Sequence, residues 1–161
     1  MAALTQEAKD LFEKVHDVVF TTASIDAQPN ACIVAMKFVI DDETIYLSDQ
    51  FFNKTLANIQ ENTKVAVVFW EGNSAFQIHG TASYVNEGAQ FEELSAKVNA
   101  AFEAMGMPIR AKGGVFVHVD ALYSSAPGPQ AGAQMCTVRS FTGRGVRTFP
   151  WARYAVFPDS R

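Results

Sequence analysis

Short polar turns separate three consecutive segments near the start of the chain, and this pattern most constrains the fold. The segments cover residues 18–25, 31–40 and 44–48, with polar turns at 26–29 and 41–43 between them. Segments rich in β-branched and aromatic residues are typical of strands, and turns this short join antiparallel neighbours. We therefore predict an antiparallel meander over residues 18–48.

The rest of the chain adds further strands and places helices only at intervals. Predicted strands lie at 64–70 (with Trp70 in the core), 75–85, 114–123 and, as a candidate closing strand, 153–157, and predicted helices at 5–18, 53–61 and 87–105. A doubly wound parallel sheet is disfavoured because a helix does not follow each strand. The pattern instead predicts a mainly β protein, an antiparallel barrel of six to seven strands with peripheral α-helices.

Length and composition indicate one domain spanning residues 1–161. The chain is 48% hydrophobic and 19% charged, which is ordinary for a globular protein with a sizeable core. It has no apolar run of membrane-spanning length, and its first residues lack the basic and apolar regions of a secretion signal. We therefore expect a cytoplasmic location and no membrane partner. The cysteines and histidines lack metal-ligand spacing, so we expect no metal site.

Charge is unevenly distributed along the chain. The formal net charge is −4, but residues 1–138 hold 8 basic and 16 acidic side chains, whereas residues 139–161 hold 5 arginines and 1 aspartate. The acidic body argues against nucleic-acid binding. The arginine-rich end belongs to a C-terminal extension at 124–161. It is expected to dock on the acidic body, to meet a partner subunit, to bind an anionic ligand or to remain solvated.

The main candidate site is a strand, a polar turn and a helix start that follow one another at residues 45–58. Lys54 and Thr55 stand at the expected helix start, and Ser48 lies at the end of the strand. A helix N-terminus offers unpaired N–H groups and a partial positive charge. Together with one ammonium group and two hydroxyls, these donors suit a phosphate monoester. The sequence therefore predicts a phosphate site at this turn.

Gly80 interrupts the predicted strand at 75–85. The polar members Gln77, His79 and Thr81 share one face of that strand because side chains alternate with a period of two. A glycine inside a strand usually marks a β-bulge or a close backbone approach. We predict one or the other at Gly80.

Several short motifs follow one another in a specific order between Val18 and about Val85. Weaker matches of the same kind continue as far as Tyr123. The motifs are Phe-Thr-Thr-Ala at 20–23, Asp-Ala-Gln-Pro-Asn at 26–30, Val-Ala-Met-Lys at 34–37, Tyr-Leu-Ser-Asp at 46–49, Lys-Thr-Leu-Ala-Asn-Ile at 54–59 and Gln-Ile-His-Gly at 77–80. In this order and spacing the chain resembles the FMN-binding split-barrel family, which includes pyridoxamine 5′-phosphate oxidases, flavin reductases and small bacterial FMN-binding proteins. The resemblance implies a split β-barrel.

The resemblance also implies a homodimer with two FMN molecules in clefts between the subunits. The implied cofactor-binding residues are Val34, Ala35, Met36, Ser48, Asp49, Asn53, Lys54, Thr55, Gln77, Trp151 and Arg153. Those at the helix start, with Ser48, would hold the phosphate, and the backbone of residues 34–36 would follow the isoalloxazine edge. Asp49 and Gln77 would be polar neighbours of the ring or ribityl chain, with Gln77 supplied by either subunit. Trp151 and Arg153 would cover the flavin from the partner's tail or form a surface strand.

Two departures separate this chain from the oxidases themselves. The oxidases usually pair an arginine with the phosphate-binding lysine, whereas Lys54 and Thr55 stand here without one. The segment 149–154 is only faintly similar to the substrate signature of the oxidases. By these two features the chain is closer to the small FMN-binding proteins, and we do not expect a true pyridoxamine phosphate oxidase.

The resemblance implies an FMN-dependent oxidoreductase that transfers hydride or electrons at flavin N5 to or from a small molecule. One alternative is a non-catalytic FMN-binding electron carrier or flavin store. Another is a split-barrel relative that uses a deazaflavin or haem. The expected partners are a second copy of the chain and a small-molecule substrate or redox partner, and the sequence identifies no catalytic side chain.

Overall fold

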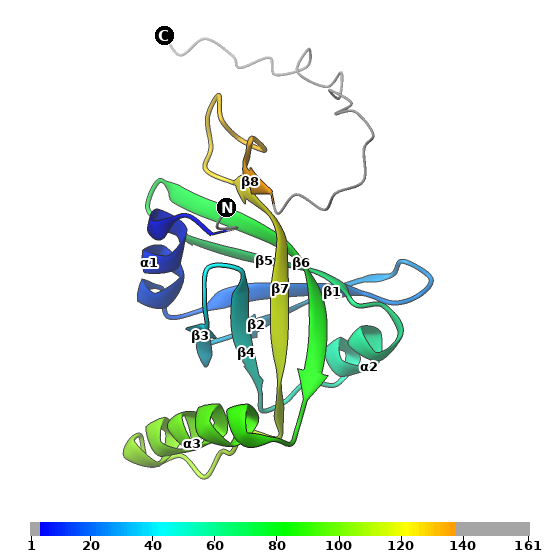
Figure 1. Cartoon of the computed structure of the whole chain (residues 1–161), viewed down its shortest axis with the longest axis vertical. Helices are drawn as coiled ribbons and strands as arrows, with labels where there is room; N and C mark the ends of the chain where they lie inside the picture. The colour runs from blue at the N-terminus through cyan, green and yellow to red at the C-terminus, as the bar shows by residue number, and fades with distance from the viewer. Residues whose placement is uncertain (1–3, 138–161) are drawn as a thin grey trace, which may run out of the picture.

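Eight antiparallel strands and three helices make up residues 4–137, the part of the chain that this computed structural model describes (Figure 1). In chain order they are α1 (Gln6–Lys14), β1 (Val18–Ala23), β2 (Pro29–Val34), β3 (Lys37–Val39), β4 (Thr44–Asp49), α2 (Lys54–Glu61), β5 (Lys64–Glu71), β6 (Ser74–Val85), α3 (Ala89–Ala104), β7 (Gly113–Ser124) and β8 (Gln134–Thr137). The strand order is β2-β1-β5-β6-β7-β4-β3, and β8 pairs with β7. The predicted mainly β split barrel is confirmed.

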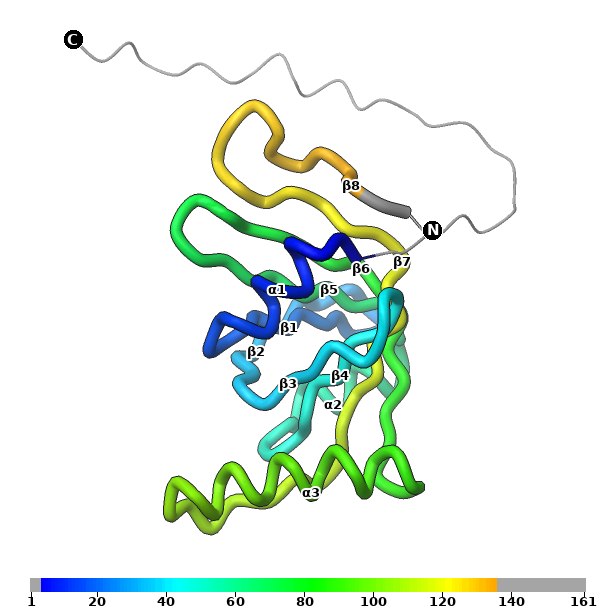
Figure 2. The backbone as a smooth tube through the Cα atoms, turned by 60° about the vertical axis from the view of Figure 1, so that its left-hand side comes forward, coloured from blue at the N-terminus to red at the C-terminus, as the bar shows by residue number. Residues whose placement is uncertain are grey.

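The two ends of the sheet are joined by the chain itself. β2 and β3 stand at opposite ends of the strand order, yet only Ala35 and Met36 separate them. The sheet therefore curls back on itself, as the tube in Figure 2 shows. The single strand predicted at 31–40 is wrong, because its first half pairs with β1 and its second half with β4. The chain has to leave one ladder before it enters the other.

The inward face of the curled sheet carries the core. Phe69 is fully buried on β5, with its ring edge-on to Phe12 of α1 at 5.2 Å and close to Phe76 of β6 at 5.8 Å between centroids. These contacts attach α1 to the barrel. Trp70, the next residue of β5, points to the opposite face and is 55% exposed, so its predicted core position is wrong. Strand side chains alternate, and a run of apolar letters hides which face each one takes.

The first helix is shorter than the predicted 5–18. Thr5 caps it, and its hydroxyl accepts a bond from the Ala8 N–H at 3.2 Å. The helix ends at Lys14 because Val18 already belongs to β1, where it pairs with Val34. Residues that helical spacing alone would assign to the end of the helix therefore lie outside it, because the chain pairs in the sheet instead.

The prediction for Gly80 is confirmed. The β6–β7 ladder shifts register between His79 and Gly80: Gly80 pairs with Val119 and His79 with Ala121, which leaves Asp120 as the extra residue of a bulge. A Cβ atom at Gly80 would lie 2.5 Å from the carbonyl oxygen of His118, so the strands also approach closely here.

The remaining elements lie at the periphery. α3 runs across one end of the barrel in both views (Figures 1 and 2). β8 was absent from the predicted strands, and the predicted closing strand at 153–157 lies outside the described residues. Within residues 4–137, none of the helices combines the length and the hydropathy needed to span a membrane.

Candidate functional site

The buried carboxylate of Asp49 shapes the turn between β4 and α2. One oxygen accepts the Phe52 N–H at 2.7 Å and the other accepts the Tyr84 hydroxyl at 2.9 Å. The carbonyl of Asp49 also accepts the Lys112 N–H at 2.8 Å. Asp49 is only 2% exposed, so its side chain is bonded within the chain and fixes the path into α2. Contact between Asp49 and a flavin stays a prediction.

Tyr84 gives this turn a testable pH dependence. Burial, followed by the hydrogen bond to Asp49 and the charge of that carboxylate, raises the pKa of Tyr84 from 10.0 to about 12. The folded protein therefore holds this proton more tightly than the unfolded chain. The resulting stabilisation is complete below pH 10 and is lost as the pH rises towards 12. In urea unfolding at roughly pH 8 and pH 11, the wild type should lose more stability than Tyr84→Phe. Equal losses would contradict this coupling.

The start of α2 is open to an anion. Asn53 occupies the N-cap position, but its side chain makes no capping bond. Within residues 4–137, the backbone N–H groups of Lys54, Thr55 and Leu56 have no acceptor, and exposed Lys54 forms no ion pair. Free N–H groups, the helix dipole and an ammonium group at one point attract a phosphate. This group, the α2 start, consists of Asn53, Lys54, Thr55 and Leu56.

The Thr55 side chain faces the barrel. It is 3% exposed, and its hydroxyl accepts a bond from Asn30 Nδ2 at 3.0 Å and donates to Cys32 Sγ at 3.4 Å. The predicted contribution of Thr55 to a phosphate site therefore narrows to its backbone N–H. Its hydroxyl anchors α2 beside β2.

Three polar residues that were not predicted as site residues complete this anchor. Asn30 also donates to Thr22 Oγ1 at 3.2 Å, and Asn58 donates to the same oxygen at 3.0 Å. Thr22 and Asn58 are buried, so these bonds replace water for otherwise unsatisfied groups. The spacing of three residues places Thr55 and Asn58 on one side of the helix, but only its packing on the sheet shows that this side is buried.

Ser48 connects the end of β4 to the link between β2 and β3. Its N–H donates to the Met36 carbonyl at 2.9 Å, and its hydroxyl accepts a bond from Gln50 Nε2 at 2.6 Å. Ala35 is exposed and belongs to neither flanking strand. Because Thr55 contacts β2 at Cys32, the β2–β3 link, the end of β4 and the α2 start form one continuous edge. Most predicted site residues therefore lie in one region.

Gln77 lies apart from this edge within one subunit. It pairs with Val68 and Tyr123 on the outward face of β6, whereas Tyr84, which contacts Asp49, stands seven residues further along the same strand. Seven residues of strand span about 23 Å. Trp151 and Arg153 lie outside the described residues. Residues 4–137 also contain no cluster of three or more His, Cys, Asp or Glu side chains suited to a metal ion.

Comparison with known sequences identifies relatives over most of the chain. The sequence profile of the family described as pyridoxamine 5′-phosphate oxidase matches residues 4–122. The uncharacterized protein MJ0282 of Methanocaldococcus jannaschii is 34% identical over 133 residues, which cover 80% of this chain and 85% of that protein.

Solved structures share the fold. HupZ of Group A Streptococcus is 25% identical with a TM-score of 0.68, over 80% of this chain and 99% of HupZ. An FMN-binding protein of Syntrophomonas wolfei is 15% identical with a TM-score of 0.66, over 75% and 85% of the two chains. The heme storage protein HutZ of Vibrio cholerae is 15% identical with a TM-score of 0.58, over 76% and 96% of the two chains. An F420 reductase is 14% identical with a TM-score of 0.57, over 74% and 98% of the two chains. The family profile covers most of the described barrel, and the chain therefore belongs to the pyridoxamine 5′-phosphate oxidase family.

Proposed function

We propose that this protein is a homodimeric FMN-binding flavoprotein of the cytoplasm that acts as an oxidoreductase on a small molecule. The observation that carries the proposal is the α2 start, where an uncapped helix end and Lys54 gather donors without acceptors in the described chain. FMN ends in a phosphate monoester, which requires such charge-assisted donors. The family and the FMN-binding protein of the same fold support this choice of ligand.

The residues along the edge fit both ends of FMN. The N–H groups of the α2 start and Lys54 Nζ would hold the phosphate, and the link formed by exposed Ala35 and half-buried Met36 would lie along the isoalloxazine ring. Bound there, FMN would supply hydride or electron transfer at its N5 atom. The chain's own contribution is to hold and orient the cofactor, because no described side chain at this edge is placed as an acid or base for the reaction.

A competition among cofactors tests this proposal. Protein freed of small molecules is titrated with FMN, riboflavin, hemin and F420, and binding is followed by fluorescence quenching or absorbance. We expect FMN to bind at least tenfold more tightly than riboflavin, because only FMN carries the phosphate. Hemin and F420 are included as competing ligands because a heme storage protein and an F420 reductase share this fold. Tighter binding of hemin or F420 than of FMN would reject the flavin assignment.

The proposed homodimer uses the outward face of the sheet. One half of that face is apolar: Val19 pairs with both Ile33 and Val68, and Ile33 is 71% exposed beside exposed Trp70. Large apolar side chains gathered on a surface usually mark an interface. We name Val19, Ile33, Val68 and Trp70 the apolar half. Gln77 pairs with Val68 at its border, which supports a partner subunit as the source of the predicted Gln77 contact.

Replacing Ile33 by glutamate should convert the dimer into a monomer. A charge in the middle of an apolar interface is desolvated without a partner and costs several kcal/mol, roughly a thousandfold in the dissociation constant. Ile25→Glu is the matched control, because Ile25 is equally exposed at 70% but lies in the β1–β2 hairpin turn. Sedimentation velocity over a concentration series measures both. A wild type that is monomeric throughout would reject the homodimer, and an unaffected Ile33→Glu dimer would reject this interface.

A further inference from the structure

The other half of the outward face is polar and hollow. A depression of about 510 Å³ lies over β1, β5, β6 and β7, next to the hairpin that joins β1 to β2. Its polar side chains include Lys64, His79, Asp120 and Tyr123, which lie outside the edge described above, and Thr22, whose hydroxyl takes part in the α2 anchor. We name this depression the polar hollow. Its volume is in the range of small-molecule sites.

Asp120 lies in the bulge opposite Gly80 and lines the polar hollow. As the extra residue of the β7 ladder, Asp120 turns outward between buried Val119 and buried Ala121. Its Oδ2 accepts bonds from Thr81 Oγ1 at 2.9 Å and from Lys64 Nζ at 3.1 Å. Bulges often re-aim a side chain beside a functional site. At this bulge a carboxylate lies next to an ammonium group.

The Asp120–Lys64 pair leaves a donor and an acceptor side by side. Within residues 4–137, Asp120 Oδ1 accepts no bond, and Lys64 Nζ, bonded to Thr81 and Asp120, retains a third hydrogen. Lys64 and Asp120 are 71% and 40% exposed, so both face arriving molecules. A group that donates one hydrogen bond and accepts another at adjacent atoms matches this pair. Amide and lactam edges have that arrangement.

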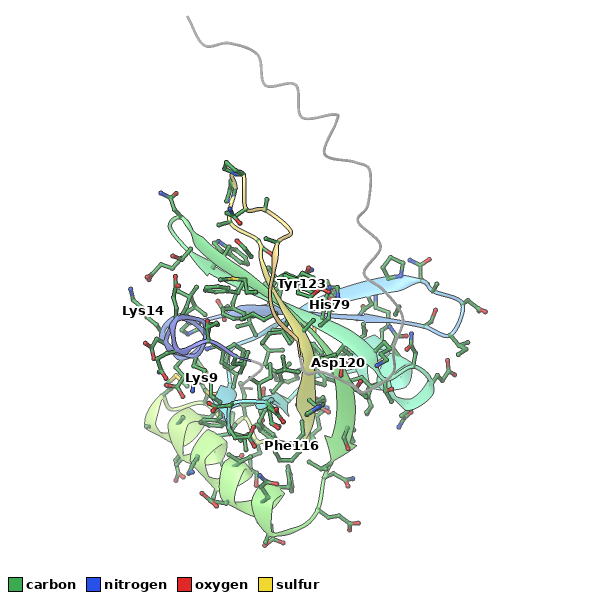
Figure 3. The ribbon with its side chains drawn as sticks, turned by 45° about the horizontal axis from the view of Figure 1, so that its top comes forward. Lys9, Lys14, His79, Phe116, Asp120 and Tyr123 are labelled. Carbon is green, nitrogen blue, oxygen red and sulfur yellow. The ribbon has the colours of Figure 1, made fainter. Side chains whose placement is uncertain are left out.

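The rest of the polar hollow is suited to a flat ring. His79 and Tyr123 are in contact, with 4.8 Å between ring centroids and ring planes tilted by 53°, and Figure 3 shows them together, with Asp120 further along β7. Small residues such as Ala66 and Gly80 line the depression between these rings and the Asp120–Lys64 pair. Aromatic walls and a low floor favour planar molecules over branched ones.

We propose that the polar hollow binds a planar heterocycle that carries a lactam or carboxamide edge. The edge donates its N–H to Asp120 and accepts from Lys64 through its carbonyl, while the ring lies beside Tyr123 and His79. None of the residues of the α2 start lines the polar hollow, so ligand binding there can be tested apart from FMN binding. The same edge occurs on a free heterocycle and on the base of a nucleoside.

Hypoxanthine and purine are matched probes, because they share a ring system and only hypoxanthine has a lactam. Binding to the full chain is followed by amide shifts in ¹H–¹⁵N NMR spectra. We expect hypoxanthine to shift the signals of Ala66, Gly80 and Ala121 and to bind about fivefold or more tightly than purine. Asp120→Asn should remove most of this preference, and Asp10→Asn on α1 should preserve it. Inosine is the second arm: tighter binding than hypoxanthine assigns a nucleoside, and weaker binding a free heterocycle.

A second variant and a titration in the presence of FMN test whether the ligand binds in the polar hollow. Tyr123→Leu keeps the Asp120 carboxylate but removes one of the aromatic rings. It should therefore weaken the binding of hypoxanthine and of purine alike. The titration is repeated with excess FMN. Binding of hypoxanthine in both conditions supports a separate site, whether or not FMN itself binds. Displacement by FMN, equal affinities for hypoxanthine and purine, or shifts confined to other signals would overturn the proposal.

Discussion

Replacing Lys54 by alanine should weaken FMN binding by about 1.5–3 kcal/mol, a roughly ten- to 150-fold rise in the dissociation constant. Lys54 is the exposed ammonium group of the α2 start and forms no ion pair within residues 4–137. Its charge is therefore available to the phosphate, and alanine preserves the helix. The flavin fluorescence that is quenched on binding measures both affinities.

Two controls separate a phosphate contact from a general defect. Riboflavin lacks the phosphate, so its affinity should be the same for Lys54→Ala and for the wild type. Lys97→Ala removes an exposed lysine of α3, whose partner Glu93 lies on the same helix, and should leave FMN affinity unchanged. An equal loss for riboflavin and FMN would assign Lys54 a structural role. Unchanged FMN affinity would remove the phosphate assignment altogether.

The Phe69→Ala substitution should lower the free energy of unfolding by about 3–5 kcal/mol. Phe69 is fully buried and joins two neighbours, Phe12 of α1 and Phe76 of β6. Truncation loses the burial of a ring and leaves a cavity between a helix and the sheet, which cannot close without moving α1. Urea unfolding followed by tryptophan fluorescence and circular dichroism gives the difference.

Phe51 provides the matched control for that substitution. It has the same side chain but is 75% exposed, in the turn before α2. Phe51→Ala should change the free energy of unfolding by no more than about 0.5 kcal/mol. A loss at Phe69 no larger than the loss at Phe51 would mean that the core is not organised around the Phe12–Phe69–Phe76 contacts.

Short-range sequence patterns predicted much of the barrel. The remaining features depend on pairing between strands that are distant in the sequence. The bulge at Gly80 followed from one glycine in a strand, because that residue alone tolerates the approach of His118. The break at Ala35 and Met36 did not follow, since residues 31–40 have uniform strand character and only the distant partners β1 and β4 divide them. β8 was missed for the same reason, because its four residues form a strand through pairing with β7.

The candidate site was predictable where local geometry determines it. A lysine at a helix start is exposed wherever the helix packs, so Lys54 could be identified from the sequence. Thr55 lies in the first turn of α2, and which side of this helix is buried depends on how α2 packs on β1 and β2. The bonds of Thr55 to Asn30 and Cys32 follow from that packing. Asp120 alternates outward with Phe116 and His118 along β7, so its exposure follows from the strand period, whereas its position beside Lys64 depends on the pairing of β5, β6 and β7.

The most direct test of the proposed function is an absorbance spectrum of the freshly purified and desalted protein, followed by mass identification of any chromophore released on denaturation. We expect a yellow protein that releases FMN at about one molecule per chain, the stoichiometry of a dimer with two equivalent sites. A colourless protein that also fails to bind added FMN, or one that releases haem or a deazaflavin, would contradict the proposed function.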